Sequence, residues 1–225
     1  MKSGWIFSHL GREVAHHRER EDYGGYEACG QVYIVPARSS VGAPPEYRYR
    51  IQLDSLHSFG DGRHPTTSLC LGALHDHLSG VAEEKRPQIT MLDAGTGTGV
   101  LAILAWLMGV RQCDAVDLSG HAIDEAAFNA SINGCDGIRF LQGDIAGCIQ
   151  GKGYDLVTAN LLPDVIRRVL HALAASLNSG GRLLLSGVGD NSRPDIEALI
   201  DHHGLAVNTH TTGQGWHCYL LARKG

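Results

Sequence analysis

The sequence predicts an α/β protein built on a mainly parallel, doubly wound sheet. Strand-like and helical segments alternate along most of its 225 residues, and this alternation is typical of a parallel sheet with helices on both faces. Near the middle of the chain, a short β-prone run is followed by a glycine-rich turn and then by an apolar helix. The length is suited to one domain, or to one domain with a small appendage.

The glycine-rich turn at 91–100 is the most informative stretch. Its glycines at 95, 97 and 99 allow a tight turn and the close approach of a ligand to the backbone. The spacing is G-x-G-x-G, because position 100 is valine, whereas pyrophosphate sites use G-x-G-x-x-G. S-adenosylmethionine fits this spacing better, since it has no phosphate and its ammonium can pair with Asp93. Asp117, which closes the next strand-like run, is placed to accept the ribose hydroxyls. A glycine turn in an ordinary α/β protein is the alternative.

The N-terminal part of the chain predicts smaller elements. Residues 1–25 are polar and have weak helical character, 31–35 reads as a strand, and 36–45 reads as a linker. Apolar and charged residues alternate over 47–53, which predicts a half-buried strand. The glycine-containing loop at 57–67 leads into a helix that Pro65 can start. This loop is a candidate lid on the ligand with Thr67 as a hydroxyl contact, although a simple helix cap is the commoner explanation.

Two further polar residues end predicted strands in the second half of the chain. Asp144 follows the strand at 138–143, where it either binds the exocyclic amine of adenine or is a solvated turn residue. Asn160 follows the strand at 154–159, at the edge where α/β sheets bind ligands, and its amide oxygen can hold an incoming amine. The other elements predicted are helices at 122–132, 164–177 and 194–203, a strand at 182–186 after a turn at Gly180 and Gly181, and a hairpin of 205–211 with 216–222.

Composition excludes several classes of function. The net charge is −5, and no basic cluster stands out beyond 18–20, so nucleic acid is not expected as the main partner. The longest apolar run, 100–110, is too short to span a bilayer, and the N-terminus lacks a signal-peptide core. Six cysteines form no C-x-x-C pair, which predicts buried free thiols and a cytoplasmic location. The thirteen histidines show no three-ligand spacing, so no functional metal is expected.

Three motifs together resemble the PrmA-type methyltransferases of ribosomal protein L11. They are the stretches at 59–67, 92–99 and 159–162, which read FGDGRHPTT, LDAGTGTG and ANLL. The resemblance runs from about residue 26 to the C-terminus and implies a class I fold, in which a seven-stranded sheet has its last strand antiparallel. It also implies S-adenosylmethionine as cofactor and methyl transfer to a protein amine, either a lysine side chain or an N-terminus. On this basis we divide the chain into a short extension and linker, 1–53, and a methyltransferase domain, 54–225.

The site residues follow from the motifs and strand ends together. We assign cofactor binding to Phe59, Gly60, Thr67, Asp93, Gly95, Gly97, Asp117, Asp144 and Asn160. Asn160 is also the catalytic candidate, because in-line transfer chiefly requires alignment and the amide can orient the lone pair of a neutral amine. This scheme requires no dedicated base. His64 precedes a helix-starting proline, a position more typical of a cap.

Three departures from the family pattern leave other functions open. The family has a substantial recognition domain before the region of resemblance, Asp61 and Arg63 replace the usual threonine, and Leu118 and Ser119 follow Asp117 where a second acid is usual two residues on. A methyltransferase acting on a small molecule or peptide is therefore the first alternative. An NAD-binding oxidoreductase is disfavoured by the glycine spacing and by the absence of a catalytic Tyr-x-x-x-Lys set.

Overall fold

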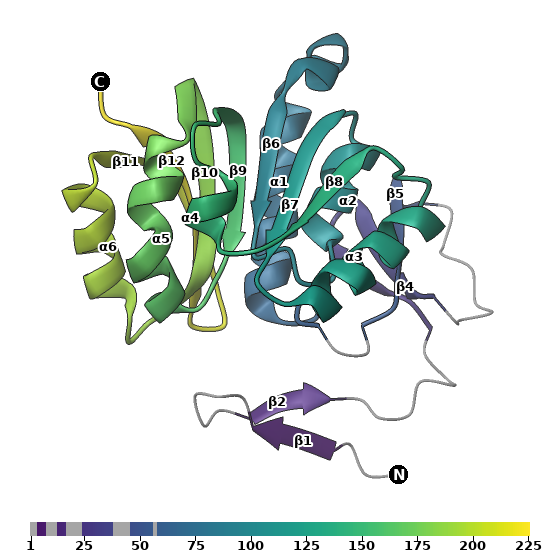
Figure 1. Cartoon of the computed structure of the whole chain (residues 1–225). Coiled ribbons are helices and arrows are strands. Elements are labelled where there is room, and N and C mark those ends of the chain that lie inside the picture. Colours follow the sequence, from purple (N-terminus) through teal and green to yellow (C-terminus); the bar gives the residue numbers. More distant parts are fainter. Residues whose placement is uncertain (1–3, 8–12, 17–23, 38–45, 56–57) are drawn as a thin grey trace.

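The computed structural model describes residues 4–7, 13–16, 24–37, 46–55 and 58–225. Its centre is a seven-stranded sheet in the order β11-β12-β10-β9-β6-β7-β8 (Figure 1). Strands β6 to β10 pair in parallel, and β12 runs antiparallel to both of its neighbours. This confirms the parallel sheet and its antiparallel last strand. The strands are β6 (Thr90–Ala94), β7 (Gln112–Asp117), β8 (Ile138–Gln142), β9 (Tyr154–Asn160), β10 (Leu177–Gly189), β11 (Leu205–Gly213) and β12 (Trp216–Arg223).

Helices cover both faces of this sheet, as the prediction of a doubly wound fold requires. One hydrophobic core lies under α1 (Pro65–Ser79), α2 (Val100–Leu107) and α3 (Gly120–Ile132). A second core lies under α4 (Ile145–Cys148), α5 (Pro163–Ala175) and α6 (Arg193–His202). Helix α2 is apolar on every side, and its residues 100–105 are all buried. Such a helix has to be covered on all sides, and α2 contacts the main sheet, α1, α3 and strand β5.

A small three-stranded sheet supplies part of the cover over α1 and α2. It consists of β3 (Tyr26–Cys29), β4 (Val32–Pro36) and β5 (Tyr49–Leu53), with β3 antiparallel and β5 parallel to β4. Burial alternates along β5, as predicted, so that its apolar side chains join the core under α1 and α2. The predicted division of the chain into 1–53 and 54–225 stays a prediction. It would assign β5 and the helices α1 and α2, whose side chains share this core, to different parts of the chain.

The N-terminal prediction of weak helix is wrong for the residues that the structure describes there. Strands β1 (Gly4–Phe7) and β2 (Glu13–His16) pair antiparallel. The polar composition of residues 1–25 concealed the short run Trp5-Ile6-Phe7, whose residue types favour strands. The basic cluster at 18–20 and most of the predicted linker at 36–45 lie outside the described residues.

One strand is longer than predicted. The glycines at 180 and 181 do not precede β10 but lie within it, where the register against β9 shifts between Leu177 and Arg182. Gly180 has φ of +77°, a conformation that L side chains rarely adopt, so the pair forms a local irregularity rather than a turn between elements.

Cysteines, long apolar helices and metal-ligating side chains were each the subject of an expectation from the sequence. All six cysteines are free thiols, and four of them are buried. None of the helices in the described segments is both long and apolar enough to cross a membrane. Across the same segments, no group of three or more His, Cys, Asp or Glu side chains is arranged to hold a metal ion.

Candidate functional site

Three of the predicted site residues lie at one level on neighbouring strands. Ala94 of β6 pairs with Val116 of β7 and with Ala159 of β9. Gly95, Asp117 and Asn160 each come next along these strands, at the carboxyl edge of the sheet. The chain leaves β6 toward β7 and β8 on one side and returns to β9 and β10 on the other (Figure 1). This edge is therefore the switch point at which open α/β sheets bind ligands.

The glycine loop uses all its backbone N–H groups within the protein. Gly97 donates to Asp117 Oδ2 at 3.0 Å, and the other N–H groups between Gly95 and Gly99 donate to main-chain carbonyls. Those carbonyls belong to Val116, Phe59 and Thr96. A phosphate-binding turn instead presents free N–H groups to its ligand. The loop thus lacks the donors that a pyrophosphate needs.

Asp93 lies beneath this loop and is only 1% exposed. Its Oδ2 accepts a bond from Thr96 Oγ1 at 2.7 Å, and its Oδ1 accepts one from Thr158 Oγ1, also at 2.7 Å. The N–H of Ala102 in α2 bonds to the same carboxylate. Burial raises the pKa of Asp93, while these bonds oppose the rise. Asp93 therefore holds the loop against the start of α2, and its direct contact with a ligand stays a prediction.

Asp117 keeps more acceptor capacity than the buried Asp93, which already accepts three bonds. Its Oδ2 accepts the Gly97 N–H and its Oδ1 accepts the Ser119 N–H, both at 3.0 Å. Because each carboxylate oxygen can accept two bonds, the contacts among the described residues leave one acceptor site on each oxygen for a ligand. Leu118, which sequence reasoning did not assign, is 75% exposed beside it. An apolar side chain directly after a strand-end acid was the available signal for that residue.

The segment at Phe59 and Gly60 is docked on the glycine loop. Thr98 donates its N–H to Phe59 O at 3.1 Å and its hydroxyl to Gly60 O at 2.8 Å. The fit is tight, since a Cβ on Gly97 would lie 2.3 Å from Phe59 O. On its other side the segment contacts the small sheet, where a Cβ on Gly62 would lie 2.3 Å from the side chain of Ile34. The structure thus joins 59–62 to the glycine loop, and the closing of this segment over a ligand stays a prediction.

Helix α1 brings Thr67 to Asn160, although 93 positions separate the two in the sequence. Asn160 Nδ2 donates to Thr67 Oγ1 at 3.2 Å, and Thr67 is 1% exposed. Helix α1 starts at Pro65 with His64 as its N-cap, where His64 Nδ1 accepts the Thr66 N–H. Burial lowers the pKa of His64, and its ring contacts those of Phe59 and Trp216 edge-on. These contacts agree with a cap and not with a solvent-facing base.

Asp144 is the predicted residue with the least connection to the rest. It is exposed, and it caps the short helix α4 by accepting the Gly147 N–H at 3.2 Å. It follows β8, the edge strand beyond β7. Its contact with an adenine amine stays a prediction.

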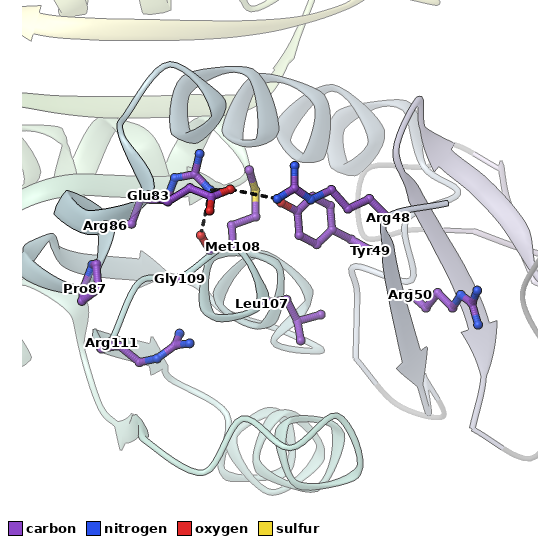
Figure 2. A pocket seen from close by; sticks show the side chains of 10 residues that line it. All are labelled: Arg48, Tyr49, Arg50, Glu83, Arg86, Pro87, Leu107, Met108, Gly109 and Arg111. Carbon is purple, nitrogen blue, oxygen red and sulfur yellow. Dashed lines mark hydrogen bonds and ion pairs between the residues drawn. The ribbon is translucent and has the colours of Figure 1, made fainter. Parts of the chain in front are cut away.

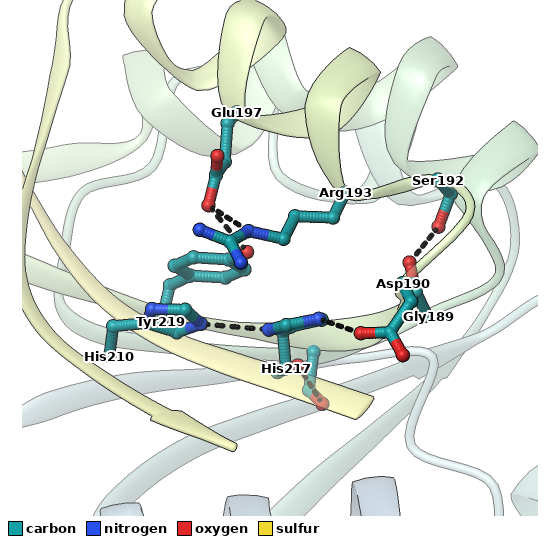
Figure 3. Close-up of polar contacts among 9 residues, drawn as sticks. Gly189, Asp190, Ser192, Arg193, Glu197, His210, His217 and Tyr219 are labelled. Carbon is teal, nitrogen blue, oxygen red and sulfur yellow. Dashed lines mark hydrogen bonds and ion pairs between the residues drawn. The ribbon is translucent and has the colours of Figure 1, made fainter. Parts of the chain in front are cut away.

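A chain of hydrogen bonds that the sequence did not predict lies beside the same edge (Figure 3). Asp190 directly follows β10, and its Oδ1 lies 2.8 Å from His217 Nε2. His217 is 4% exposed, and its Nδ1 lies 2.9 Å from His210 Nε2. His210 stacks on Tyr219, whose hydroxyl donates to Glu197. Only His217 and Tyr219 share an element, β12, while the others come from α6, β11 and the end of β10, so no local motif could have marked the whole set.

Comparisons with known proteins identify the family. The family model of PrmA, described as ribosomal protein L11 methyltransferase, matches residues 15–224. The ribosomal protein L11 methyltransferase of Desulfitobacterium hafniense is 37% identical over 81% of this chain and 56% of its own length. That of Exiguobacterium sp. is 31% identical over 93% of this chain and 64% of its own length, so the chain spans somewhat more than half of these relatives.

A solved structure agrees with this result. The ribosomal protein L11 methylase of Lactobacillus delbrueckii subsp. bulgaricus superimposes with a TM-score of 0.80 at 26% identity, and it covers 90% of this chain and 100% of that one. The expected resemblance is thereby confirmed, and the chain belongs to the PrmA family of ribosomal protein L11 methyltransferases.

Proposed function

We propose that this chain is an S-adenosylmethionine-dependent methyltransferase that methylates an amine on a protein. The observation that carries the proposal is the glycine loop, whose N–H groups are all used within the protein, beside a carboxylate with acceptor sites left. A ligand with a ribose but no phosphate suits that combination, whereas a dinucleotide requires free N–H donors. Family membership points to the same ligand.

The residues present fit this cofactor. The Asp117 carboxylate would hold the ribose hydroxyls through its remaining acceptor sites, while the Gly97 and Ser119 N–H groups keep it in place. The exposed side chain of Leu118 offers an apolar surface next to it for the adenine ring. Phe59 and Gly60 would bound the opposite side, where Thr98 anchors them. The cofactor supplies an electrophilic methyl group, so the protein's task is chiefly to align the acceptor.

Asn160 would provide that alignment. Its Nδ2 is engaged by Thr67, which fixes the orientation of the amide. In the part of the chain that the structure describes, no hydrogen-bond partner is found for its Oδ1. That oxygen would accept a bond from the acceptor amine and direct the nitrogen lone pair along the line of transfer. An apolar surround lowers an amine's pKa and favours the neutral, reactive form.

The acceptor we propose is ribosomal protein L11, after which the relatives are named. A lysine side chain or the N-terminus of that protein would supply the amine. The cytoplasmic location expected from the sequence is compatible with such a substrate and stays a prediction.

Two measurements test the proposal in order. Isothermal titration calorimetry should show binding of S-adenosylhomocysteine and none of NAD; binding of NAD alone would overturn the choice of cofactor. Incubation with S-adenosylmethionine and L11 should then add methyl groups to L11, detected by mass spectrometry after proteolysis. Cofactor binding with unmodified L11, but with methylation of a free amino acid or metabolite, would replace the protein acceptor with a small molecule.

A further inference from the structure

A cavity lies at the edge of the main sheet opposite to the carboxyl edge. It has a volume of about 610 Å³, within the range typical of small-molecule sites. Its walls come from the start of β5, from the 3-10 helix η1 (Glu83–Gln88) that precedes β6, and from the end of α2 with the residue before β7. These segments lie at the amino ends of β6 and β7, so the cavity is separate from the carboxyl edge that carries Asp117 and Asn160.

Charge distinguishes this cavity from an ordinary surface hollow. Among the residues that the structure describes, four arginines line it, Arg48, Arg50, Arg86 and Arg111, against a single carboxylate, Glu83. The whole chain carries a net charge of −5, so this concentration of positive charge runs against the average of the molecule. Arginine forks match the oxygens of phosphate groups in pairs, which makes such a lining suited to a phosphate ligand.

Two of these arginines are held in fixed positions. Arg86 is 7% exposed and donates from Nε to Val81 O at 2.9 Å and from Nη1 to Met108 O at 3.2 Å. Arg111 donates from Nη1 to the carbonyls of Trp106, in the last turn of α2, and of Val110, after that helix, and its guanidinium lies over the ring of Trp106. These bonds stabilise the end of α2. They engage only some of the five N–H groups of each guanidinium and leave a pre-oriented remainder.

Stabilisation of the end of α2 does not account for the presence of the other two arginines, Arg48 and Arg50. Arg48 lies with Glu83 and Arg86 in a cluster, and Arg50 and Arg111 lie further away on either side of Leu107 (Figure 2). Glu83 Oε1 is 2.9 Å from Arg48 Nη2 and 3.8 Å from Arg86 Nη1. A carboxylate oxygen thus lies between two guanidinium groups, where a phosphate oxygen would also be stabilised. The side chains of Arg48 and Glu83 are 61% and 68% exposed, so their pairing is weak and a multivalent anion can displace it.

We propose that this cavity binds a small molecule carrying two or more phosphate groups. The volume exceeds what one phosphate fills, and the arginines are spread around it rather than gathered at one point. A nucleic acid is the weaker candidate because the net negative charge of the chain opposes a long polyanion. The proposal does not depend on the proposed methyl transfer, because binding is measured directly.

Calorimetric titration of the full chain with inorganic pyrophosphate is the test, with Glu83→Gln and Glu84→Gln as a matched pair. Both variants remove one negative charge from η1, but only Glu83 lines the cavity. Glu83→Gln should tighten pyrophosphate binding by about tenfold, since it frees two guanidinium groups, and Glu84→Gln should change it by less than about twofold. Arg50→Gln should weaken binding by about fivefold, while Arg167→Gln, on α5, should leave it unchanged.

Several results would overturn the proposal. They are an absence of pyrophosphate binding to the unaltered chain, an equal response of the two glutamate variants, or binding of a single-stranded RNA oligonucleotide without binding of pyrophosphate. Displacement of S-adenosylhomocysteine by pyrophosphate would place the anion at the carboxyl edge and would equally contradict the assignment. Circular dichroism melting curves of each variant establish that a lost signal reflects the cavity and not unfolding.

Discussion

Replacing Asp117 with alanine is the sharpest test of the ribose assignment. The carboxylate has two acceptor sites left after the bonds from Gly97 and Ser119, both at 3.0 Å. A hydrogen bond to a charged group contributes about 1.5–3 kcal/mol, and water compensates part of the loss at a half-buried site. We therefore expect Asp117→Ala to weaken S-adenosylhomocysteine binding by roughly ten- to a hundredfold, at about 1.4 kcal/mol for each factor of ten.

The same variant also removes an anchor of the glycine loop, so the two effects have to be separated. Calorimetry with S-adenosylhomocysteine and with an analogue that lacks both ribose hydroxyls completes a thermodynamic cycle. If the carboxylate binds the hydroxyls, the analogue should bind weakly to the original chain. The Asp117→Ala substitution should then cause little further loss of affinity for that analogue. The two ligands should then show a coupling of about 1–2 kcal/mol between carboxylate and hydroxyls.

Equal losses for the two ligands would refute the assignment, because they would mean that Asp117 acts only through Gly97 and the loop. Unchanged affinity for both in a folded variant would refute the role of Asp117 altogether. A thermal melt of the unliganded variant provides the control for folding.

Four other predictions follow from the same site. Asn160→Ala should lower kcat by about a hundredfold while the Kd of S-adenosylhomocysteine changes by less than about threefold, and equal losses would make Asn160 chiefly a cofactor contact. Gly97→Ala should destabilise the fold by about 2 kcal/mol in urea titration, since φ is +54° and a main-chain oxygen lies 2.3 Å from the new Cβ; an unchanged midpoint would contradict this. Burial lowers the pKa of His64 in the folded chain below 6.5. As pH falls, His64 therefore gains its proton in the unfolded chain before it does in the folded one, and stability is lost below about pH 6.5. His64→Asn keeps an N-cap residue that does not titrate in this range, so it should reduce the loss of stability between about pH 7 and 5. A variant whose stability depends on pH as steeply as that of the original chain would contradict the burial argument. Amides at 60–63 should gain hydrogen-exchange protection on adding S-adenosylhomocysteine, and equal protection in both states would make the segment a rigid wall.

Local chemistry made much of the fold predictable. The glycines at 95, 97 and 99 all have positive φ, as a turn between strand and helix required. Alternating burial along 49–53 and the helix start at Pro65 likewise follow from rules that act within a few residues. The N-terminal strands escaped prediction because their apolar runs are too short to stand out from polar surroundings.

The site could be predicted only in part, because its contacts join distant segments. The sequence placed Asp93 in the site but gave no indication that Thr96 and Thr158 bind both of its oxygens. The role of Thr98 in anchoring Phe59 was equally hidden, since it depends on how two loops meet. Strand-end position predicts which edge a residue reaches, whereas burial decides whether that residue contacts the ligand or supports its neighbours.

The most direct measurement of the central claim is a crystal structure of the chain with S-adenosylhomocysteine. The ribose hydroxyls should bond to the Asp117 carboxylate, and the sulfur should point toward Asn160 at the carboxyl end of β9. A ligand held by N–H groups at the start of α2, or one bound away from this edge of the sheet, would contradict the account.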